Sequence, residues 1–490
     1  MARHDLAARL GSLVWPDIRA SRGIAGLDAL APLIEAYPPG GVIVFGEGEP
    51  GVQQLIAELR RRAPEDLIVA ADLERGCGQQ VSEFTKLPPA MALAANSDPE
   101  AAWEAGLITG REARAAGIEM VFAPVVDVNT AARNPIIATR AFGDDPHRVA
   151  TLASAFARGL HEGGVLAVAK HFPGHGSTVQ DSHSELARVT ASEEQLQAVD
   201  LVPFRTLIAE RVAGVMVGHL EVPALDPVAG RPATASPNVV LDHLRARLGF
   251  DGLVVTDALD MGGFRQEPAA PLAALHAGCD VLLMPADPLA SCAALADAHA
   301  RHELSDETLN AAVARVQAAR DRLAGLTISA HPLPDDLGAV LLAASLTSHG
   351  PALPAFVPGE PLDVRLFGED DSGMVLPAFT ETLEGGGHEL AAGARGVGLV
   401  ITSVAAWSGS SRLPSLQRQR LHWMLEHGQL AAVVVLGSPY EALDLPAVAP
   451  AVLAYQATPE AAHLAALALL GELPTPGRLP VGALAADDLK

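Results

Sequence analysis

Short apolar runs alternate with longer amphipathic stretches over residues 1–330. Apolar runs of about four to eight residues, separated by segments long enough for a helix, predict parallel strands joined by crossover helices. We expect eight strands, at residues 13–15, 41–45, 67–71, 119–126, 165–169, 214–218, 252–256 and 280–284. Eight such units in a segment of this length predict a (β/α)8 barrel of the TIM type, whose active site lies at the C-terminal ends of its strands.

A helix starting near Ser305 is expected to close this half of the chain. Ser305 is a suitable N-cap, Asp306 and Glu307 complement the helix dipole, and Gly325 follows the last apolar position. The proline-containing stretch after it predicts a linker over residues 331–345. We therefore expect one domain over residues 1–330.

The remaining residues, 346–490, alternate between apolar and amphipathic segments again. Strand-like runs lie at residues 364–367, 397–402, 431–436 and 451–454, with helices expected over 416–426 and 459–470. This pattern predicts a second, smaller α/β domain of the sandwich type.

Polar residues come directly after the apolar runs of the first half at six positions: Asp72, Asp127, Lys170, His171, His219 and Asp257. Because the C-terminal ends of parallel barrel strands meet at one mouth, we expect these side chains to gather there. His219 is equally well explained as a histidine of the pocket wall that is satisfied by its neighbours.

The densest group of ionisable residues is the stretch K-H-F-P-G-H-G-S-T-V-Q-D-S-H, from Lys170 to His183. Its proline and glycines prevent a continuing helix. His171, His175, Asp181 and His183 are acceptable metal ligands, but two histidines four positions apart share a face only on a helix. A structural loop with satisfied histidines is a second interpretation. The third is proton transfer, because Asp181 and His183 project on the same side of an extended segment, where the carboxylate can orient the imidazole.

Composition narrows the class of protein. Hydrophobic residues make up 49% of the chain and the formal net charge is −24, which indicates a globular protein and disfavours binding to nucleic acid or an anionic membrane. Three cysteines are too few for a disulfide framework or a zinc cluster. No apolar run is long enough to cross a bilayer, and residues 1–13 lack the apolar core of a signal peptide, so we expect a cytoplasmic protein.

The D-S-H end of the loop resembles the bacterial β-N-acetylhexosaminidase branch of glycoside hydrolase family 3. In that branch a mobile loop supplies an Asp–His dyad in place of a carboxylic acid, and the matching residues here are Asp181 and His183. The segment G-F-D-G-L-V-V-T-D-A-L-D-M resembles the family's nucleophile motif and implies that Asp257 is the nucleophile. Taken alone, Asp257 could instead cap the following helix. The segment V-V-V-L-G-S-P-Y-E-A-L resembles the second domain common in the family.

The same resemblance implies residues that bind sugar hydroxyls. These are Asp72 in A-A-D-L-E-R-G, Arg140 in N-P-I-I-A-T-R-A-F-G, and the pair Lys170 and His171. Each could also be a member of a buried ion pair.

One motif departs from the family pattern D-x-E-G-G-R-V-Q-R, because Cys77 and Gln80 stand where the family usually has arginines. Gln80 would bring a neutral amide to the sugar site in place of a fixed charge. The sugar preferred by the site therefore stays open.

The implied activity is that of a retaining exo-β-N-acetylglucosaminidase acting on small carbohydrates, with cell-wall fragments as the implied substrates and peptidoglycan recycling as the implied role. We expect no metal and no organic cofactor. Phosphorolysis is an alternative, because a histidine in the acid/base position repels phosphate less than a carboxylate does. β-Glucosidase activity and an inactive sugar-binding protein are further alternatives. The sequence does not indicate an oligomeric state.

Overall fold

The computed structural model describes residues 2–46, 48–180, 186–262, 269–405, 408–410 and 412–482. Contacts between Cα atoms divide the chain into two compact units. The first comprises Met1–Lys86, Ala102–Val128 and Pro146–Leu333, and the second comprises Leu87–Ala101, Asn129–Asp145 and Pro334–Lys490. Two segments from the first half of the sequence are therefore built into the second unit.

The first unit is an α/β barrel of parallel strands. A seven-stranded sheet has the order β10-β8-β6-β5-β4-β3-β2, and β1 pairs with β11. Only Pro16 separates β1 from β2, and a parallel bridge joins Val255 of β10 to Val281 beside β11, so the ring of strands closes. The strands are β1 (Val14–Trp15), β2 (Asp17–Arg19), β3 (Gly41–Phe45), β4 (Ile68–Ala71), β5 (Met120–Val121), β6 (Leu166–Phe172), β8 (Gly214–Val217), β10 (Leu253–Thr256) and β11 (Leu282–Leu283). The expected TIM-type fold is confirmed.

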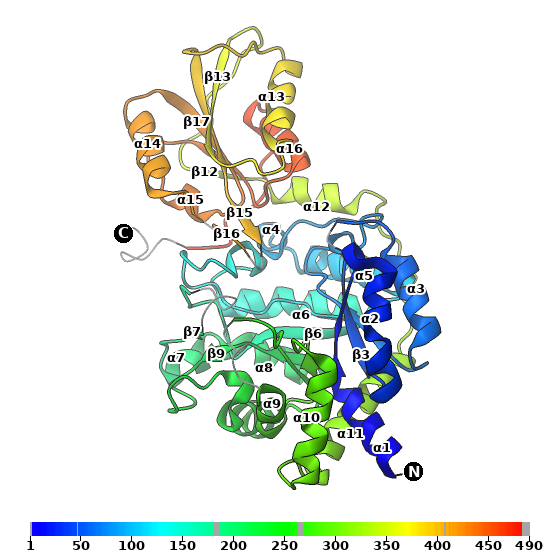
Figure 1. Cartoon of the computed structure of the whole chain (residues 1–490). Helices are drawn as coiled ribbons and strands as arrows, with labels where there is room; N and C mark the ends of the chain where they lie inside the picture. Colours follow the sequence, from blue (N-terminus) through cyan, green and yellow to red (C-terminus); the bar gives the residue numbers. More distant parts are fainter. Residues whose placement is uncertain are drawn as a thin grey trace. The chain divides into compact units, whose positions relative to one another are not determined.

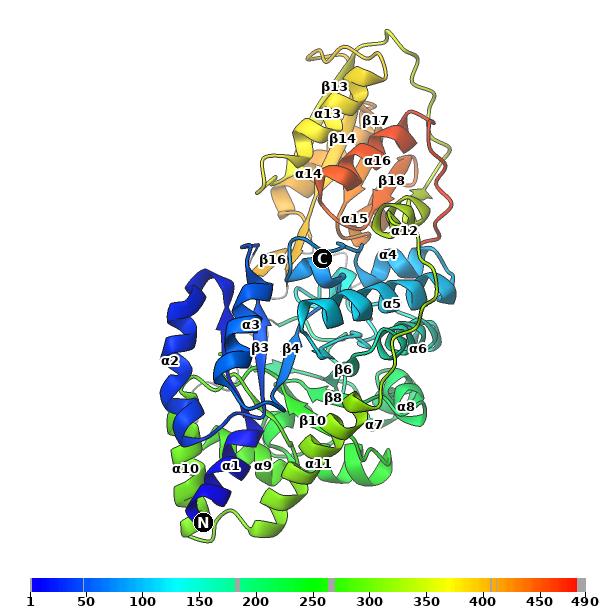
Figure 2. The same cartoon turned by 90° about the vertical axis from the view of Figure 1, so that its right-hand side faces the viewer.

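Helices surround these strands, and α2 and α3 lie side by side on the outside of β3 (Figure 1, Figure 2). Helix α3 turns its apolar residues, from Val52 to Leu59, inward and places three arginines in its last turn. Helix α11 begins after Ser305, whose hydroxyl accepts from Thr308 N, as expected. The helices are α1 (Ala2–Leu13), α2 (Gly23–Ala36), α3 (Val52–Arg62), α5 (Pro99–Ala116), α6 (Pro146–Glu162), α7 (Glu193–Ala198), α8 (Leu201–Ala209), the π-helix η5 (Asn238–Arg247), α9 (Ala270–Ala277), α10 (Pro288–Ala300) and α11 (Asp306–Ala324).

Strand β6 is longer than its apolar run. It was expected to end at Ala169, but it continues through Lys170 and His171 to Phe172, and all seven of its residues are buried. The two polar residues therefore belong to the rigid end of a strand and not to the loop behind it.

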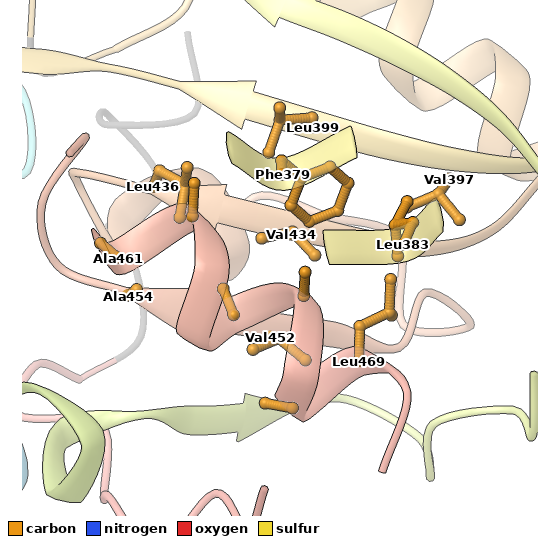
Figure 3. Packing of buried hydrophobic residues seen from close by; sticks show 14 of the residues in the cluster. Phe379, Leu383, Val397, Leu399, Val434, Leu436, Val452, Ala454, Ala461 and Leu469 are labelled. Atoms are coloured by element: carbon orange, nitrogen blue, oxygen red, sulfur yellow. The ribbon is translucent and has the colours of Figure 1, made fainter. Parts of the chain in front are cut away.

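The second unit is an α/β sandwich. Its sheet has the order β12-β18-β17-β14-β13, with four parallel strands and β12 antiparallel at one edge. The strands are β12 (Thr347–His349), β13 (Leu362–Gly368), β14 (Arg395–Ile401), β17 (Leu430–Leu436) and β18 (Ala451–Ala454). Helices α13 (Val375–Gly385) and α16 (Pro459–Leu469) direct apolar side chains onto one face of the sheet (Figure 3), and α14 (Ser415–Glu426) packs on the other face.

The segments that join this unit from the first half lie against its C-terminal part. Helix α4 (Ala90–Ala95) packs on α12 (Leu337–Ser345) and shares an apolar cluster with Tyr440, Tyr455 and Val481. Helix α12 lies within the stretch expected as a linker, and its Leu337, Leu341 and Leu342 are buried. Residues 337–345 are thus part of the folded unit because their leucines pack.

Short elements complete the second unit: η3 (Ala138–Arg140), α15 (Tyr440–Leu443), and the hairpin of β15 (Ser403–Ala405) and β16 (Ser408–Ser410). Across the described ranges of both units, no helix has an apolar stretch of the length needed to span a bilayer.

Candidate active site

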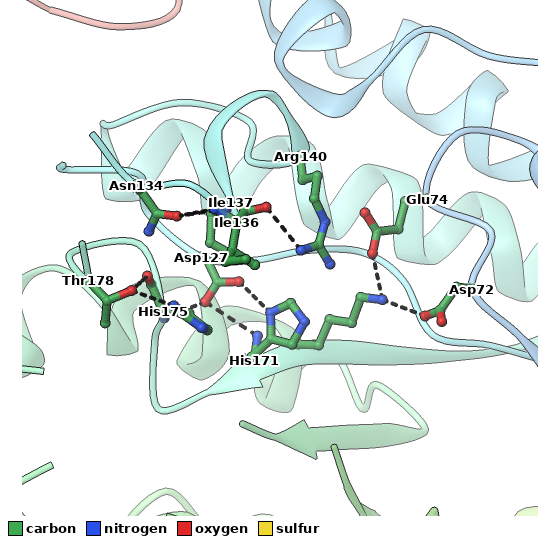
Figure 4. A network of polar contacts seen from close by, with 11 residues as sticks. Asp72, Glu74, Asp127, Asn134, Ile136, Ile137, Arg140, His171, His175 and Thr178 are labelled. Carbon is green, nitrogen blue, oxygen red and sulfur yellow. Dashed lines mark hydrogen bonds and ion pairs between the residues drawn. The ribbon is translucent and has the colours of Figure 1, made fainter. Parts of the chain in front are cut away.

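Lys170 lies at the centre of a buried charge network in the first unit (Figure 4). Its side chain is 3% exposed, and its Nζ lies 2.6 Å from Asp72 Oδ1 and 2.6 Å from Glu74 Oε1. Asp72 follows β4, so these contacts join the ends of two strands. Two carboxylates thus lie around this one ammonium. Such an arrangement can accept hydrogen bonds from hydroxyl groups.

Asp127 contacts the end of β6 and the turn after it through its two carboxylate oxygens (Figure 4). Oδ2 lies 2.7 Å from His171 Nδ1, and Oδ1 accepts from His175 N at 2.6 Å. Burial raises the pKa of Asp127, but the interactions with His171 and His175 outweigh burial, so its pKa lies below the ordinary range. The carboxylate therefore stays ionised.

His175 is a neutral residue of the same turn. Its Nδ1 lies 2.6 Å from Thr178 Oγ1. Burial lowers its pKa to about 4, against the opposing charges of Asp127 and Asp257. The ends of β6 and β10 flank the same end of β8, because Phe172 and Thr256 both pair with Val217.

Asp257 directly follows β10 and is partly exposed. Its backbone N–H donates to Val217 O at 2.9 Å, and its Oδ1 accepts from Ala258 N at 2.9 Å. The next helix in the described part of the chain, α9, begins at Ala270, well beyond Ala258, whose N–H donates to the Asp257 carboxylate. The carboxylate is therefore placed at the strand end and not at the start of a helix.

His219 contacts the residue that follows this strand end. It is fully buried, its Nδ1 lies 2.8 Å from Thr234 Oγ1, and its Nε2 lies 3.0 Å from Ala258 O. Both ring nitrogens thus contact neighbouring protein groups, and one of them anchors the residue that follows Asp257. That geometry favours a role in the pocket wall.

Gln80 ties two strand-end loops together. Its Oε1 accepts from Gly46 N at 2.9 Å, and its Nε2 donates to Asp72 O at 3.3 Å. Cys77 is fully buried, and burial raises the pKa of its thiol. At the two positions where the family usually has arginines, this chain therefore has a buried thiol, Cys77, and an amide, Gln80, that binds backbone groups of two loops.

Arg140 lies in the second unit, at the end of η3, and is 9% exposed. Its Nη1 donates to Ile136 O at 3.1 Å, and the side chain of Asn134 accepts from Ile136 N and Ile137 N (Figure 4). The segment around Arg140, residues 129–143, is called the Arg140 segment. Local hydrogen bonds thus fix its shape.

Asn129 joins the two ends of the Arg140 segment. Its backbone N–H donates to Gly143 O at 2.9 Å. Its side-chain amide donates to the Tyr440 hydroxyl at 2.7 Å, and that hydroxyl donates to Asn129 O at 3.0 Å. Both ends of the segment are therefore bound by residues of the second unit.

The structure brings six of the expected residues to the strand ends of the first unit: Asp72, Gln80, Lys170, His171, His219 and Asp257. Asp181 and His183 lie outside the described residues. The described residues contain no group of three side chains suited to a metal ion, a range that leaves out two of the four ligands considered above.

Sequence reasoning did not single out Glu74 as a partner of Lys170, nor Asp127 as the group that joins His171 to His175. Asp127 follows an apolar run, which is a usable signal, but its partners lie on another strand. Glu74 sits in an irregular turn whose geometry has no local pattern.

Comparison with known proteins supports the fold and identifies the family. The family described as "Glycosyl hydrolase family 3 N terminal domain" matches residues 10–319. A protein of Methylococcus capsulatus named beta-hexosaminidase is 39% identical over 266 residues, which are 52% of this chain and 78% of that protein. A protein of the same name from Tolumonas auensis is 39% identical over 271 residues, 52% of this chain and 79% of its own.

Among solved structures, a glycoside hydrolase family 3 β-N-acetylglucosaminidase from a Paenibacillus strain matches 97% of this chain and 98% of its own, with a TM-score of 0.83 and 30% identity. Both units of the present structure are covered by that match. The chain belongs to glycosyl hydrolase family 3 and is a glycoside hydrolase with a barrel domain and a second domain.

Proposed function

We propose that the chain is a retaining, exo-acting β-N-acetylglucosaminidase. The observation that carries the proposal is the position of Asp257 at the end of β10, where its backbone N–H donates to Val217 O of β8, the strand that β6 pairs with on its other side. Relatives at 39% identity are named beta-hexosaminidase, and the Paenibacillus structure is that of a β-N-acetylglucosaminidase. These matches support N-acetylhexosamine as the sugar.

In the proposed mechanism, Asp257 attacks the anomeric carbon of the terminal sugar and forms a glycosyl ester. His183, oriented by Asp181, gives its proton to the leaving glycosidic oxygen. The neutral His183 then takes a proton from water, whose oxygen attacks the anomeric carbon and releases Asp257 as a carboxylate. The anomeric configuration is retained after the two displacements.

His175 does not supply this proton in the proposed scheme. Burial lowers its pKa to about 4, so at neutral pH its ring is the uncharged imidazole and not the imidazolium that a general acid needs. Its Nδ1 is also engaged with Thr178. The histidine of the dyad is therefore the proposed acid.

Sugar binding is assigned to groups that fix hydroxyls. Asp72 and Lys170 are already paired in the first unit, which holds both side chains in position for a ligand. His171 and Arg140 are proposed to bind further hydroxyls. Gln80 is proposed to assist sugar binding next to Asp72, because its amide donates to the Asp72 backbone carbonyl.

The altered arginine positions favour a second candidate, a β-glucosidase, because Cys77 and Gln80 bring no fixed charge to the site. A panel of aryl β-glycosides separates the two. The proposal predicts a clear preference for GlcNAc over glucose, and the opposite preference would replace it with the second candidate.

The proposed natural substrates are GlcNAc-terminated cell-wall fragments, and water is the proposed acceptor. Products are measured with and without added phosphate. Free GlcNAc in both cases supports hydrolysis, whereas sugar 1-phosphate formed only with phosphate would show phosphorolysis. Binding of GlcNAc without turnover of any aryl glycoside would indicate an inactive sugar-binding protein.

A further inference from the structure

Asp127 is a fully buried carboxylate that the proposed mechanism does not use. It accepts from His175 N at 2.6 Å, lies 2.7 Å from His171 Nδ1, and has a longer contact of 3.4 Å with His171 N. All of these groups belong to the first unit. One side chain thus contacts both the ring of His171 and the turn that follows it.

Keeping a charge in this place is costly unless it is paired and hydrogen-bonded, since burial of an isolated carboxylate costs several kcal/mol. The two histidines provide the compensation, and the pKa of Asp127 consequently lies below its ordinary range. An ionised carboxylate only accepts hydrogen bonds. His171 Nδ1 must therefore carry the proton in its contact with Asp127.

We propose that Asp127 is a positioning residue for sugar binding, which fixes the ring and the tautomer of His171 so that Nε2 is the atom presented to a hydroxyl of the sugar. The proposal rests on the proposed function, in which His171 binds such a hydroxyl. A histidine whose second nitrogen is held by a carboxylate has one defined working atom.

Replacing Asp127 by asparagine has a specific chemical consequence. The N–H of His175 cannot change its role, so the amide oxygen has to stay on it. The amide NH2 then faces His171 Nδ1, which must lose its proton to accept a bond. The substitution therefore moves the proton of a neutral His171 to Nε2 and reverses that atom from acceptor to donor.

A simpler role, in which Asp127 only stabilises the turn, predicts a different result. Thr178 lies in the same turn and binds the ring of His175, which lies edge-on to the His171 ring at 6.1 Å between centroids, whereas Asp127 binds the His171 ring itself. Thr178→Val thus removes a hydrogen bond of the turn and keeps the carboxylate of Asp127 on the His171 ring. It is the matched control for a purely structural effect.

The test is a double-mutant cycle on aryl β-GlcNAc and its 3-, 4- and 6-deoxy analogues, with Asp127→Asn, His171→Ala, the double variant and Thr178→Val. The wild type should disfavour one deoxy analogue by about tenfold, the value of one hydrogen bond to a partner of this kind. His171→Ala and Asp127→Asn should both lose that discrimination, mainly through KM. The double variant should be no worse than His171→Ala, and Thr178→Val should keep the discrimination.

Additive effects of the two substitutions, or a discrimination that survives in Asp127→Asn, would overturn the proposal. Should Asp127→Asn not fold, Asp127→Glu keeps the charge but displaces the oxygens, and the same loss of discrimination is expected. ¹⁵N NMR of histidine-labelled protein, assigned with His171→Ala, gives a readout without turnover. It should show a protonated Nδ1 in the wild type and a changed tautomer in Asp127→Asn. Absence of wild-type activity would refute the proposed function and leave this NMR result to decide the role of Asp127.

Discussion

The two units of the molecule differ in the residues at the C-terminal ends of their parallel strands. In the first unit ionisable residues lie in the last positions of the strands or directly after them: Asp72, Lys170, His171, His219 and Asp257. In the second unit β14 leads into Thr402 and β17 into Gly437 and Ser438. Strand β13 is followed by three acidic residues, of which Asp370 accepts from Leu376 N in the first turn of α13. Thr402 Oγ1 accepts from Ser438 N at 2.7 Å, so that end is closed by a hydroxyl and backbone groups. The same strand arrangement therefore serves chemistry in one unit and packing in the other.

One buried charge network from each unit shows a similar difference. In the second unit, Arg412 contacts Glu441 at 2.6 Å and Asp444 at 2.7 Å, and Arg418 lies 3.6 Å from Asp444. Two cations thus meet two anions. In the first unit, one ammonium meets two carboxylates and a further carboxylate meets histidines. We expect substitutions at the first site to change activity and those at the second to change stability.

The largest effect is expected from Asp257→Asn. Removing the nucleophile should lower kcat on the order of 10⁴-fold, while the melting temperature stays within a few degrees of the wild type. The measurements are steady-state turnover of an aryl β-GlcNAc and thermal unfolding. Retention of a tenth of the wild-type kcat would show that Asp257 is not the nucleophile.

Asp200→Asn should raise stability in the first unit, in contrast to substitutions of the buried charges in the second. Burial, and then the charge of Asp127, raises the pKa of Asp200 to about 7. Its side chain packs against Gly174, where an added Cβ would lie 2.6 Å from Asp200 Cβ. A raised folded-state pKa means that protonated Asp200 stabilises the fold at low pH and that this contribution is lost as the pH rises through about 7.

The asparagine variant should therefore gain stability over the wild type as the pH rises from about 4, the unfolded-state pKa, to 7 and above, by about 4 kcal/mol at most. Urea unfolding at pH 5 and pH 8 measures the gain. An advantage that is equal at both values, or larger at pH 5, would contradict the assigned ionisation.

Arg412→Met tests the balanced network of the second unit. Removing one partner leaves buried carboxylates uncompensated and should lower the free energy of unfolding by about 3 kcal/mol. kcat/KM, measured well below the melting temperature, should stay within about twofold of the wild type. A large fall in kcat/KM with unchanged stability would show that this charge network serves activity and not stability, contrary to the expected difference between the units.

Tyr440→Phe and Tyr455→Phe make the smallest and most selective change. Both tyrosines are buried in one cluster of the second unit, but the Tyr440 hydroxyl binds Asn129 at one end of the Arg140 segment, whereas the Tyr455 hydroxyl binds Thr347. Each variant should lose about 1 kcal/mol of stability. Only Tyr440→Phe should raise KM, by about fivefold, because the proposed role of Arg140 depends on the shape of its segment. An equal KM in the two variants would remove that link.

Much of the fold follows from local patterns along the chain. The eight barrel strands were predicted because each is an apolar run, and the N-cap of α11 because Ser305 precedes acidic residues. The end of β6 was placed too early because Lys170 and His171 are polar, although the barrel buries them. Periodicity is informative only where burial follows hydrophobicity.

The parts that sequence reasoning missed depend on contacts between distant residues. The segments Leu87–Ala101 and Asn129–Asp145 join the second unit through partners, such as Tyr440 and Val481, that come more than 300 residues later in the chain. The roles of Asp127 and Gln80 likewise depend on which strand ends are neighbours. A motif identifies the chemical type of a residue, and the topology decides what it touches.

Covalent trapping tests the central claim most directly. A 2-deoxy-2-fluoro glycoside or another slow fluorinated substrate should label the protein once, and peptide mapping should find the sugar on the peptide of β10, at Asp257. Asp260→Asn, in the same motif, should still be labelled, and Asp257→Asn should not. Turnover without any adduct on Asp257, or a sugar attached to another carboxylate, would contradict the account.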